Sequence, residues 1–146
     1  MAISRIVEIA KFSDQYIKNL SANIVRVVEG NAKNVELNRV QMYNSTDSSD
    51  GPLIHKSTGS PYLSKAYAKK TGKKKPNLHL TGDFQKGMLI TMPSMKEYFI
   101  SSKDYKTKWI AENYGSIFGV SPVNQPKAQK SNGELLINDY KKAVFK

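Results

Sequence analysis

The clearest hydrophobic pattern lies at the start of the chain, where apolar side chains recur every three or four positions across residues 3–29. This spacing predicts one apolar stripe along a long helix, and Gly30 is a natural place for that helix to end. A helix of this length needs something apolar to lie on, either a small sheet of its own domain or a neighbouring copy. The stripe consists of Ile3, Ile6, Val7, Ala10, Tyr16, Ile17, Leu20, Ile24, Val27 and Val28.

The next part of the chain predicts two more helices separated by a loop. Residues 34–43 could form a short helix, but their apolar positions Val35, Leu37, Val40 and Met42 mix helical and alternating spacing. Residues 44–52 are rich in Asn, Asp, Ser, Gly and Pro, which favour turns. The second of these helices is predicted to begin at Ser60, a capping residue, with Pro61 at the first helical position. Gly72 lies just past its predicted end.

Alternating patterns then predict a small antiparallel sheet. Leucines alternate with polar residues over positions 78–81, as on a half-buried strand. Residues 87–92 and 97–101 predict two further strands, joined by a turn at Pro93 and Ser94.

The C-terminal part returns to helical patterns. Residues 104–114 predict a helix that ends at Gly115, and residues 116–130, with two prolines and little periodicity, predict a loop or extended arm. Ser131 and Glu134 stand at the ends of an S-x-x-E capping box and predict the start of a last helix that runs to about residue 145. We expect that helix to bury Leu136, Tyr140, Ala143 and Val144.

This order of elements predicts an α+β fold in a single domain of residues 1–146. The fold would combine a long N-terminal helix, a small antiparallel sheet and further helices, including a C-terminal one. The loops at 44–59 and 116–130 are long for a domain of this size, and long loops in compact domains are usually functional or disordered.

Charge and composition limit the cellular compartments and the classes of partner that suit this protein. The formal net charge is +11, which favours an acidic partner such as nucleic acid, an anionic surface or the acidic face of another protein. The chain has no cysteine, which excludes disulfides and thiolate chemistry. No apolar run approaches the roughly 20 residues of a membrane span, and charges interrupt the apolar start. We therefore expect no membrane association and a cytosolic protein at synthesis.

The residues that would support catalysis or metal binding do not form recognisable groups. His55 and His79 are far apart in sequence, with no carboxylate at ligand spacing. The D-S-S-D-G segment lacks the final bidentate glutamate of a calcium loop, and G-K-K-K lacks the glycine and hydroxyl residues of a phosphate loop. Carboxylates are sparse and scattered. We therefore expect no enzyme activity, no metal and no cofactor.

A lysine-rich segment is the strongest candidate for a binding site. Between Gly51 and Gly82 there are seven lysines and no acidic residue, with Tyr62 and Tyr67 interleaved. Lysines can neutralise phosphates and tyrosines can stack on bases. Equally, the run can be a helix end, where the dipole favours cations, followed by a solvated loop. The candidate contacts with DNA or an acidic partner are Lys69, Lys70, Lys73, Lys74 and Lys75.

Several short motifs resemble those of a family of viral structural proteins. They are N-R-V-Q-M-Y at 38–43, S-D-G-P-L-I at 49–54, the pair Tyr62 and Tyr67, L-x-L-T-G-D-F at 78–84, Y-F-I-S-S-K-D at 98–104, and W-I-A-E-N-Y-G-S-I-F-G-V-S-P at 109–122. The pattern resembles small virion structural proteins of tailed phages and prophages, especially those of Bacteroides-type hosts. It is also similar in layout to the tail-completion and minor tail proteins. The resemblance covers somewhat more than half of the chain.

The resemblance implies a head–tail connector, neck-ring or tail-adaptor protein that assembles as a ring around the DNA channel. Its fold would place a small barrel-like sheet beside the long helix, with Gly82 and Asp83 in a tight turn that closes the sheet and with Phe84 and Phe99 in the core. Its partners would be copies of itself, the portal, adaptor or tail proteins, and packaged DNA through non-specific contacts. It would reside in the virion, after assembly in the host cytoplasm.

A second hypothesis is a small basic protein that binds nucleic acid non-specifically and works alone. The first hypothesis predicts a ring or a complex with other phage proteins, and little affinity for free DNA at physiological salt. The second predicts a monomer or dimer whose DNA affinity falls steeply as salt rises.

Overall fold

The computed structural model describes residues 2–78 and 82–146. Across these residues the chain is mixed α+β, which confirms the predicted class. The elements follow in the order α1 (Ala2–Lys18), α2 (Leu20–Glu29), α3 (Ala32–Tyr43), α4 (Lys65–Thr71), α5 (Asp83–Lys86), β1 (Met88–Ser94), β2 (Glu97–Ser102), α6 (Thr107–Tyr114) and α7 (Gln125–Val144).

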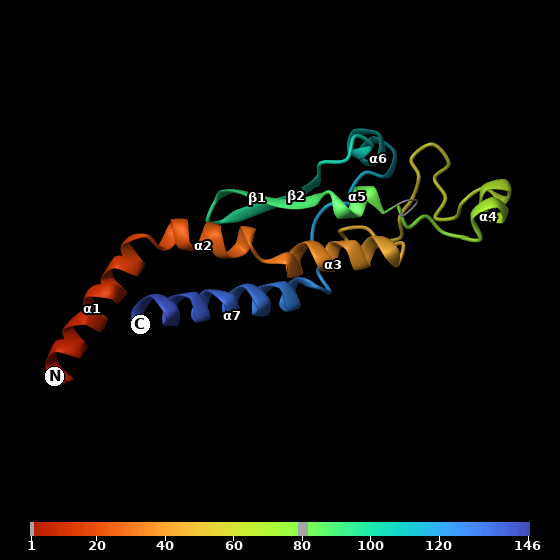
Figure 1. Ribbon diagram of the computed structural model, residues 1–146. Coiled ribbons are helices and arrows are strands. Elements are labelled where there is room, and N and C mark those ends of the chain that lie inside the picture. The colour runs from red at the N-terminus through yellow and green to blue at the C-terminus, as the bar shows by residue number, and fades with distance from the viewer. Residues whose placement is uncertain (1, 79–81) are drawn as a thin grey trace.

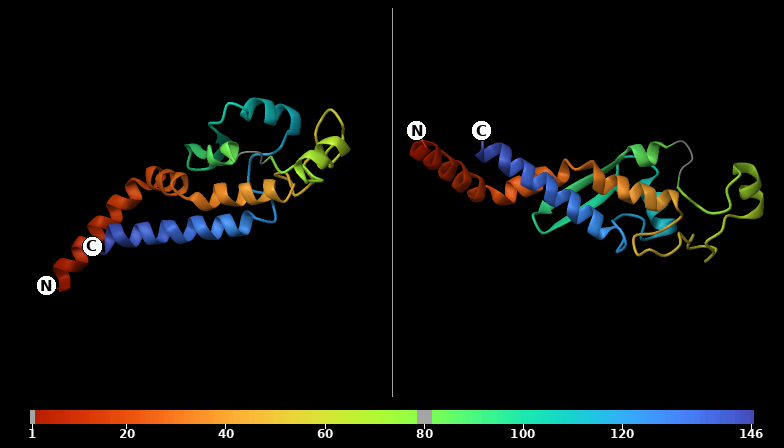
Figure 2. Two further views of the ribbon diagram at one scale, coloured as in Figure 1. Left: turned by 45° about the vertical axis from the view of Figure 1, so that its right-hand side comes forward. Right: turned by 90° about the horizontal axis from the view of Figure 1, so that it is seen from below.

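The molecule is elongated, with a helical layer on one side of a small hairpin (Figure 1). Helices α1, α2 and α3 follow one another along the long axis, and α7 runs back beside them towards the N-terminus (Figure 2). The hairpin of β1 and β2 packs on α2 and α3. Both termini lie at one end, and α4 lies at the other end (Figure 1).

The predicted N-terminal helix is broken once, at Asn19. Its φ of −102° and ψ of 19° depart from helical values, and α1 and α2 change direction there (Figure 1). Side-chain amides compete for the backbone at this point, because Asn19 Nδ2 donates to the carbonyl of Gln15 and Asn23 Nδ2 to that of Tyr16. As a result α2 packs on β1 while the start of α1 projects away. Gly30 ends α2, as predicted.

The sheet has two antiparallel strands among the described residues, so the expected barrel-like closure is wrong. Ile90 faces Ile100 and Thr91 faces Phe99, and the pairing is irregular between Thr91 and Ser94. Strand β1 therefore continues through the predicted turn, and the turn falls at residues 95–96. The strand predicted at 78–81 lies largely outside the described residues.

The expectation for the two phenylalanines is half right. Phe84 is buried, whereas the Phe99 side chain is 57% exposed. Successive residues of a strand point to opposite faces, so the inward position of Ile100 directs its neighbour Phe99 to solvent. The hydrophobic core lies where α3, the hairpin, α6 and the 116–124 loop meet, and its fully buried members include Met42, Leu53 and Ile117.

Helix α3 is confirmed, and three of its polar side chains are as buried as its most buried apolar ones. Asn34, Asn38 and Gln41 are all 5% exposed or less. Gln41 Nε2 donates to the carbonyl of Gly119, and its Oε1 accepts from the amide of Ser121. Buried polar groups stabilise a fold only when they are paired in this way. These bonds fasten the 116–124 loop to α3.

Two helices begin at different residues from those predicted. Helix α4 starts four residues later than expected, because the hydroxyl of Ser64 accepts from the amide of Tyr67 and caps it in place of Ser60. Helix α7 starts at Gln125, so residues 125–130 of the predicted loop are helical. Ser131 therefore lies inside the helix, where its Oγ accepts from Asn31 Nδ2 at 3.0 Å.

The C-terminal helix otherwise follows the predicted pattern only in part. Val144 is fully buried, whereas Leu136, Tyr140 and Ala143 are partly buried. Helix α6 begins three residues later than predicted, and Gly115 ends it as expected. Within residues 2–78 and 82–146, no helix has both the length and the apolar character needed to cross a lipid bilayer.

A candidate nucleic-acid interface

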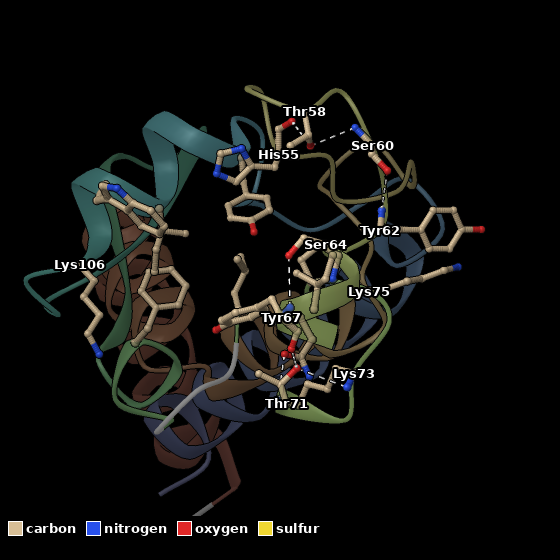
Figure 3. A pocket seen from close by; sticks show the side chains of 18 of the residues that line it. His55, Thr58, Ser60, Tyr62, Ser64, Tyr67, Thr71, Lys73, Lys75 and Lys106 are labelled. Atoms are coloured by element: carbon tan, nitrogen blue, oxygen red, sulfur yellow. Dashed lines mark hydrogen bonds between the residues drawn. The ribbon is translucent and has the colours of Figure 1, made fainter. Parts of the chain in front are cut away.

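A cleft of about 790 Å³ opens between the 55–78 segment on one side and α5 and α6 on the other (Figure 3). We call it the basic aromatic cleft, because its charged side chains are lysines and its largest side chains are aromatic. Its lysines are Lys70, Lys73, Lys75 and Lys106, and its rings are His55, Tyr62, Tyr67, Phe84, Trp109 and Tyr114.

Helix α4 provides one wall of this cleft. Gly72 ends the helix in the left-handed conformation, with φ of 72°, as glycine allows. The chain then turns back, and the amide of Leu63 donates to the carbonyl of Lys74 at 2.8 Å. This closed segment holds Tyr67 towards the cleft (Figure 3), and Lys70 of the same helix also lines it.

The rim near His55 is held by an aromatic contact and by local hydrogen bonds. The rings of His55 and Tyr114 meet edge to face with centroids 5.1 Å apart. His55 Nδ1 lies 2.7 Å from Ser57 Oγ, and an isolated bridge pairs His55 with Ser60. This histidine therefore has a packing role in the cleft. His79 lies outside the described residues.

The five predicted lysines divide into two groups. Lys70, Lys73 and Lys75 line the cleft, whereas Lys69 and Lys74 are exposed and absent from its lining. Lys69 and Lys70 lie in the last turn of α4, as expected. The ammonium group of Lys75 lies 5.6 Å from the centre of the Tyr62 ring, a cation–π distance.

Sequence reasoning missed the opposite wall, which α6 provides. Lys106, Trp109 and Tyr114 line the cleft, more than 30 positions after the lysine run. Lys106, Ile110 and Tyr114 are spaced four apart, and Trp109 lies three residues after Lys106. This spacing was a usable signal, because residues three and four apart share a helix face. Only the fold shows that this face meets the lysine segment.

Gly82 and Asp83 do not close a sheet, contrary to the expected role. Gly82, with φ of 86°, precedes the short helix α5, and its carbonyl accepts from the amide of Lys86. Gly82 and Phe84 line the floor of the cleft. Gln85, also at the floor, donates from Nε2 to the carbonyl of Leu78.

The electrostatic character of the cleft is uniform among the described residues. No aspartate or glutamate contributes to its lining, and the ammonium groups of Lys75 and Lys106 lie at the rims, with their ends directed outward (Figure 3). Burial, and to a smaller extent the nearby Tyr67, raises the pKa of the Tyr114 hydroxyl, which stays protonated at neutral pH. The cleft therefore attracts anions.

In the described part of the chain, no three His, Asp or Glu side chains gather in a way that could hold a metal ion.

The D-S-S-D-G segment is a turn, as predicted. Asp47 Oδ1 accepts from the amides of Ser49 and Gly51 at 2.8 and 2.9 Å, so this carboxylate is used within its own loop.

A second surface is apolar and lies at the other end of the molecule, on α1. Ile3, Ile6 and Val7 are 80%, 64% and 61% exposed, and Ile17 is also exposed. We call this the α1 apolar face. The first turns of α1 extend beyond the end of α7 (Figures 1 and 2).

No known protein family, curated protein or solved structure matches this chain.

Proposed function

We propose that this protein is a structural component of a tailed-phage virion, of the head–tail connector, neck-ring or tail-completion type. It joins copies of itself, and portal, adaptor or tail proteins, without catalysing a reaction. The observation that carries the proposal is the α1 apolar face, which projects from the molecule uncovered. The resemblance of residues 38–122 to such proteins supports the same conclusion.

Most of the α1 apolar face lies outside the face that α1 uses within its own chain. Tyr16 packs edge to face on Tyr140 of α7, with ring centroids 5.3 Å apart, and Ser13 lies within hydrogen-bond distance of the Tyr140 hydroxyl. At about 100° per residue, Ile3 lies roughly 140° and Val7 roughly 180° around the helix from Tyr16, whereas Ile6 lies roughly 80° from it. Ile3 and Val7 therefore leave a second apolar stripe for another molecule.

The positions of the two candidate surfaces favour a ring. The α1 apolar face and the basic aromatic cleft differ in chemistry and lie at opposite ends of an elongated molecule (Figure 1). A subunit with different contact surfaces at its two ends associates head to tail, and such association produces a ring when the rotation closes. The 44–78 extension gives each copy additional reach towards a neighbour.

The mass of the protein in solution, measured by size-exclusion chromatography with light scattering, tests the proposal. We expect the wild-type chain to form an oligomer that the double variant Ile6→Lys, Val7→Lys dissociates, because each lysine would bury a charge in the contact. Gln15→Lys is the matched control, since it adds charge to α1 at an exposed position away from the face. A wild-type monomer, both alone and mixed with portal or tail proteins, would contradict the proposal.

A second candidate function is non-specific nucleic-acid binding by a small basic protein. The basic aromatic cleft favours it, because four lysines line the cleft and the described lining residues include no carboxylate. Affinity for DNA that falls steeply with salt, in a protein that stays monomeric, would favour this candidate over a virion subunit.

A further inference from the structure

We propose that the basic aromatic cleft is a binding site for single-stranded nucleic acid, with unpaired bases stacked on its rings and phosphates held by its lysines. This inference rests on the second candidate function, nucleic-acid binding. It does not depend on assembly through the α1 apolar face.

The arrangement of charge identifies the ligand as a polyanion. Lys73 and Lys75 lie on one side of the opening and Lys106 on the other (Figure 3), and Lys70 also lines the cleft. Because the ends of Lys75 and Lys106 lie at the rims, a chain of phosphates that crosses the opening meets positive charge at both edges, with no competing carboxylate among the described lining residues. The cleft volume, about 790 Å³, is within the range usual for sites that bind small molecules and cofactors.

The rings add a feature that phosphate binding alone does not require. Trp109 on α6 is 59% exposed, and Tyr67 on α4 is 44% exposed, although both line a concave surface. Large aromatic side chains usually bury their faces, so open rings on two walls of one cleft are suited to a flat, apolar partner. Nucleic-acid bases have such faces, and stacking on aromatic side chains is independent of base identity.

The same feature selects a single strand over a duplex and over an acidic peptide. In a duplex the base faces are stacked on one another and only the edges are accessible, so Trp109 and Tyr67 would have nothing to stack on. An acidic peptide would satisfy the lysines but offers no stacking partner for the rings. We therefore expect the affinity to depend on both groups of residues.

Fluorescence of Trp109, the only tryptophan of the chain, gives a direct measurement. The probes are a 12-nucleotide oligo-dT, a 12-base-pair duplex and a polyglutamate peptide, each titrated into the full-length protein. We expect oligo-dT to quench Trp109 and to bind at least tenfold more tightly than the duplex. We expect polyglutamate to bind weakly and without quenching.

Matched variants separate stacking from charge. Trp109→Ala should weaken oligo-dT binding roughly tenfold, measured by anisotropy of a labelled strand, whereas Phe99→Ala, at an exposed aromatic residue outside the lining, should not. Lys70→Ser with Lys75→Ser should weaken binding and lower the slope of log affinity against log salt by about 1.4. Lys69→Ser with Lys74→Ser makes the same charge change outside the cleft and should have a smaller effect.

Each contrary result overturns a different step. Equal affinity for the strand and the duplex, unaffected by Trp109→Ala, would overturn the stacking inference and leave nucleic-acid binding in place. If neither the strand nor the duplex binds, both the stacking inference and nucleic-acid binding by the cleft are wrong. If polyglutamate binds with higher affinity than oligo-dT and does not quench Trp109, the cleft is a site for an acidic protein partner.

Discussion

The buried side chain of Asn38 accepts a hydrogen bond from the backbone amide of Gly119 at 3.0 Å. Its Nδ2 donates to the carbonyl of Ile117 at 2.8 Å, so the side-chain amide of Asn38 pairs with one backbone donor and one backbone acceptor of the 116–124 loop. Asn38 is fully buried, as is Ile117. The 116–124 loop, which leads to α7, is thus held by a helix almost 80 positions earlier in the chain.

Substitution Asn38→Leu should lower the free energy of unfolding by about 3 kcal/mol, because it leaves a buried amide and a buried carbonyl without partners. Urea denaturation followed by circular dichroism would measure the loss. Asn138→Leu is the control, since Asn138 is exposed on α7 and should change stability little. Equal stability of the Asn38 variant and the wild type would show that this pairing does not hold the loop.

Arg26 joins α2 to α7 through Asp139, with distances of 2.8 and 2.7 Å from its two terminal nitrogens to the carboxylate. The hydrogen bond from Arg26 lowers the pKa of the Asp139 carboxyl, with a further contribution from the Tyr16 hydroxyl. A carboxyl with a lowered folded pKa stabilises the protein above its unfolded pKa, about 3.9, and this contribution is lost as pH falls through the folded value.

We therefore expect Arg26→Met to destabilise the protein by about 1 kcal/mol at pH 7, since Arg26 is largely exposed. The difference from wild type should shrink as pH falls below the unfolded pKa, about 3.9, and vanish once the folded carboxyl is protonated, as measured by thermal unfolding across pH. Lys130→Met removes a wider pair with Glu134, 3.9 Å apart and exposed, and should have almost no effect. A pH-independent difference for Arg26→Met would rule out the ionic account.

Tyr16 contributes a pH dependence at the alkaline end. Burial, together with the hydrogen bond to Asp139, raises the pKa of its hydroxyl to about 12. The unfolded chain loses this proton near pH 10, so the stabilisation is complete below pH 10 and is lost as pH rises towards 12. Tyr16→Phe should cost about 1 kcal/mol at pH 7, and the difference should shrink above pH 10. Tyr105→Phe, at an 87% exposed position, should leave stability unchanged throughout.

Two glycines that end helices should respond differently to alanine. Gly72 has φ of 72° and ψ of 9°, a left-handed conformation that alanine adopts at a cost of about 1 kcal/mol, with nothing within 4 Å of the added Cβ. Gly115 has φ of 73° and ψ of −114°, outside the regions open to other residues, and its Cβ would meet Lys56 Cε at 3.3 Å.

Gly115→Ala should therefore lower the melting temperature clearly more than Gly72→Ala. The two variants make the same chemical change at the end of a helix, so each serves as the other's control. A larger loss for Gly72→Ala would show that packing around α4, rather than backbone conformation, sets the cost.

Local patterns predicted the elements better than the ways in which they meet. The two hairpin strands followed from alternation and the helix ends at Gly72 and Gly115 from the backbone freedom of glycine, whereas the apolar positions of 34–43 mixed helical and alternating spacing. The start of α7 did not follow, because Ser131 lies inside the helix, where its hydroxyl accepts from Asn31, the cap residue of α3. The sequence predicted the wall of the basic aromatic cleft that carries Lys70, Lys73 and Lys75. It did not predict Lys106 and Trp109, because only the fold brings these distant residues to the same cleft.

The sequence by itself determined the α+β class, the basic charge and the carboxylate-free lysine segment, since these depend on residue types and short-range spacing. Only the tertiary structure decided which lysines share a cleft with aromatic rings, which asparagines are buried, and that the side chains of the α1 apolar face are exposed. The physical reason is that burial and electrostatic environment come from contacts between distant segments, such as Asn38 with Gly119. Spacing along a single element carries no information about those contacts.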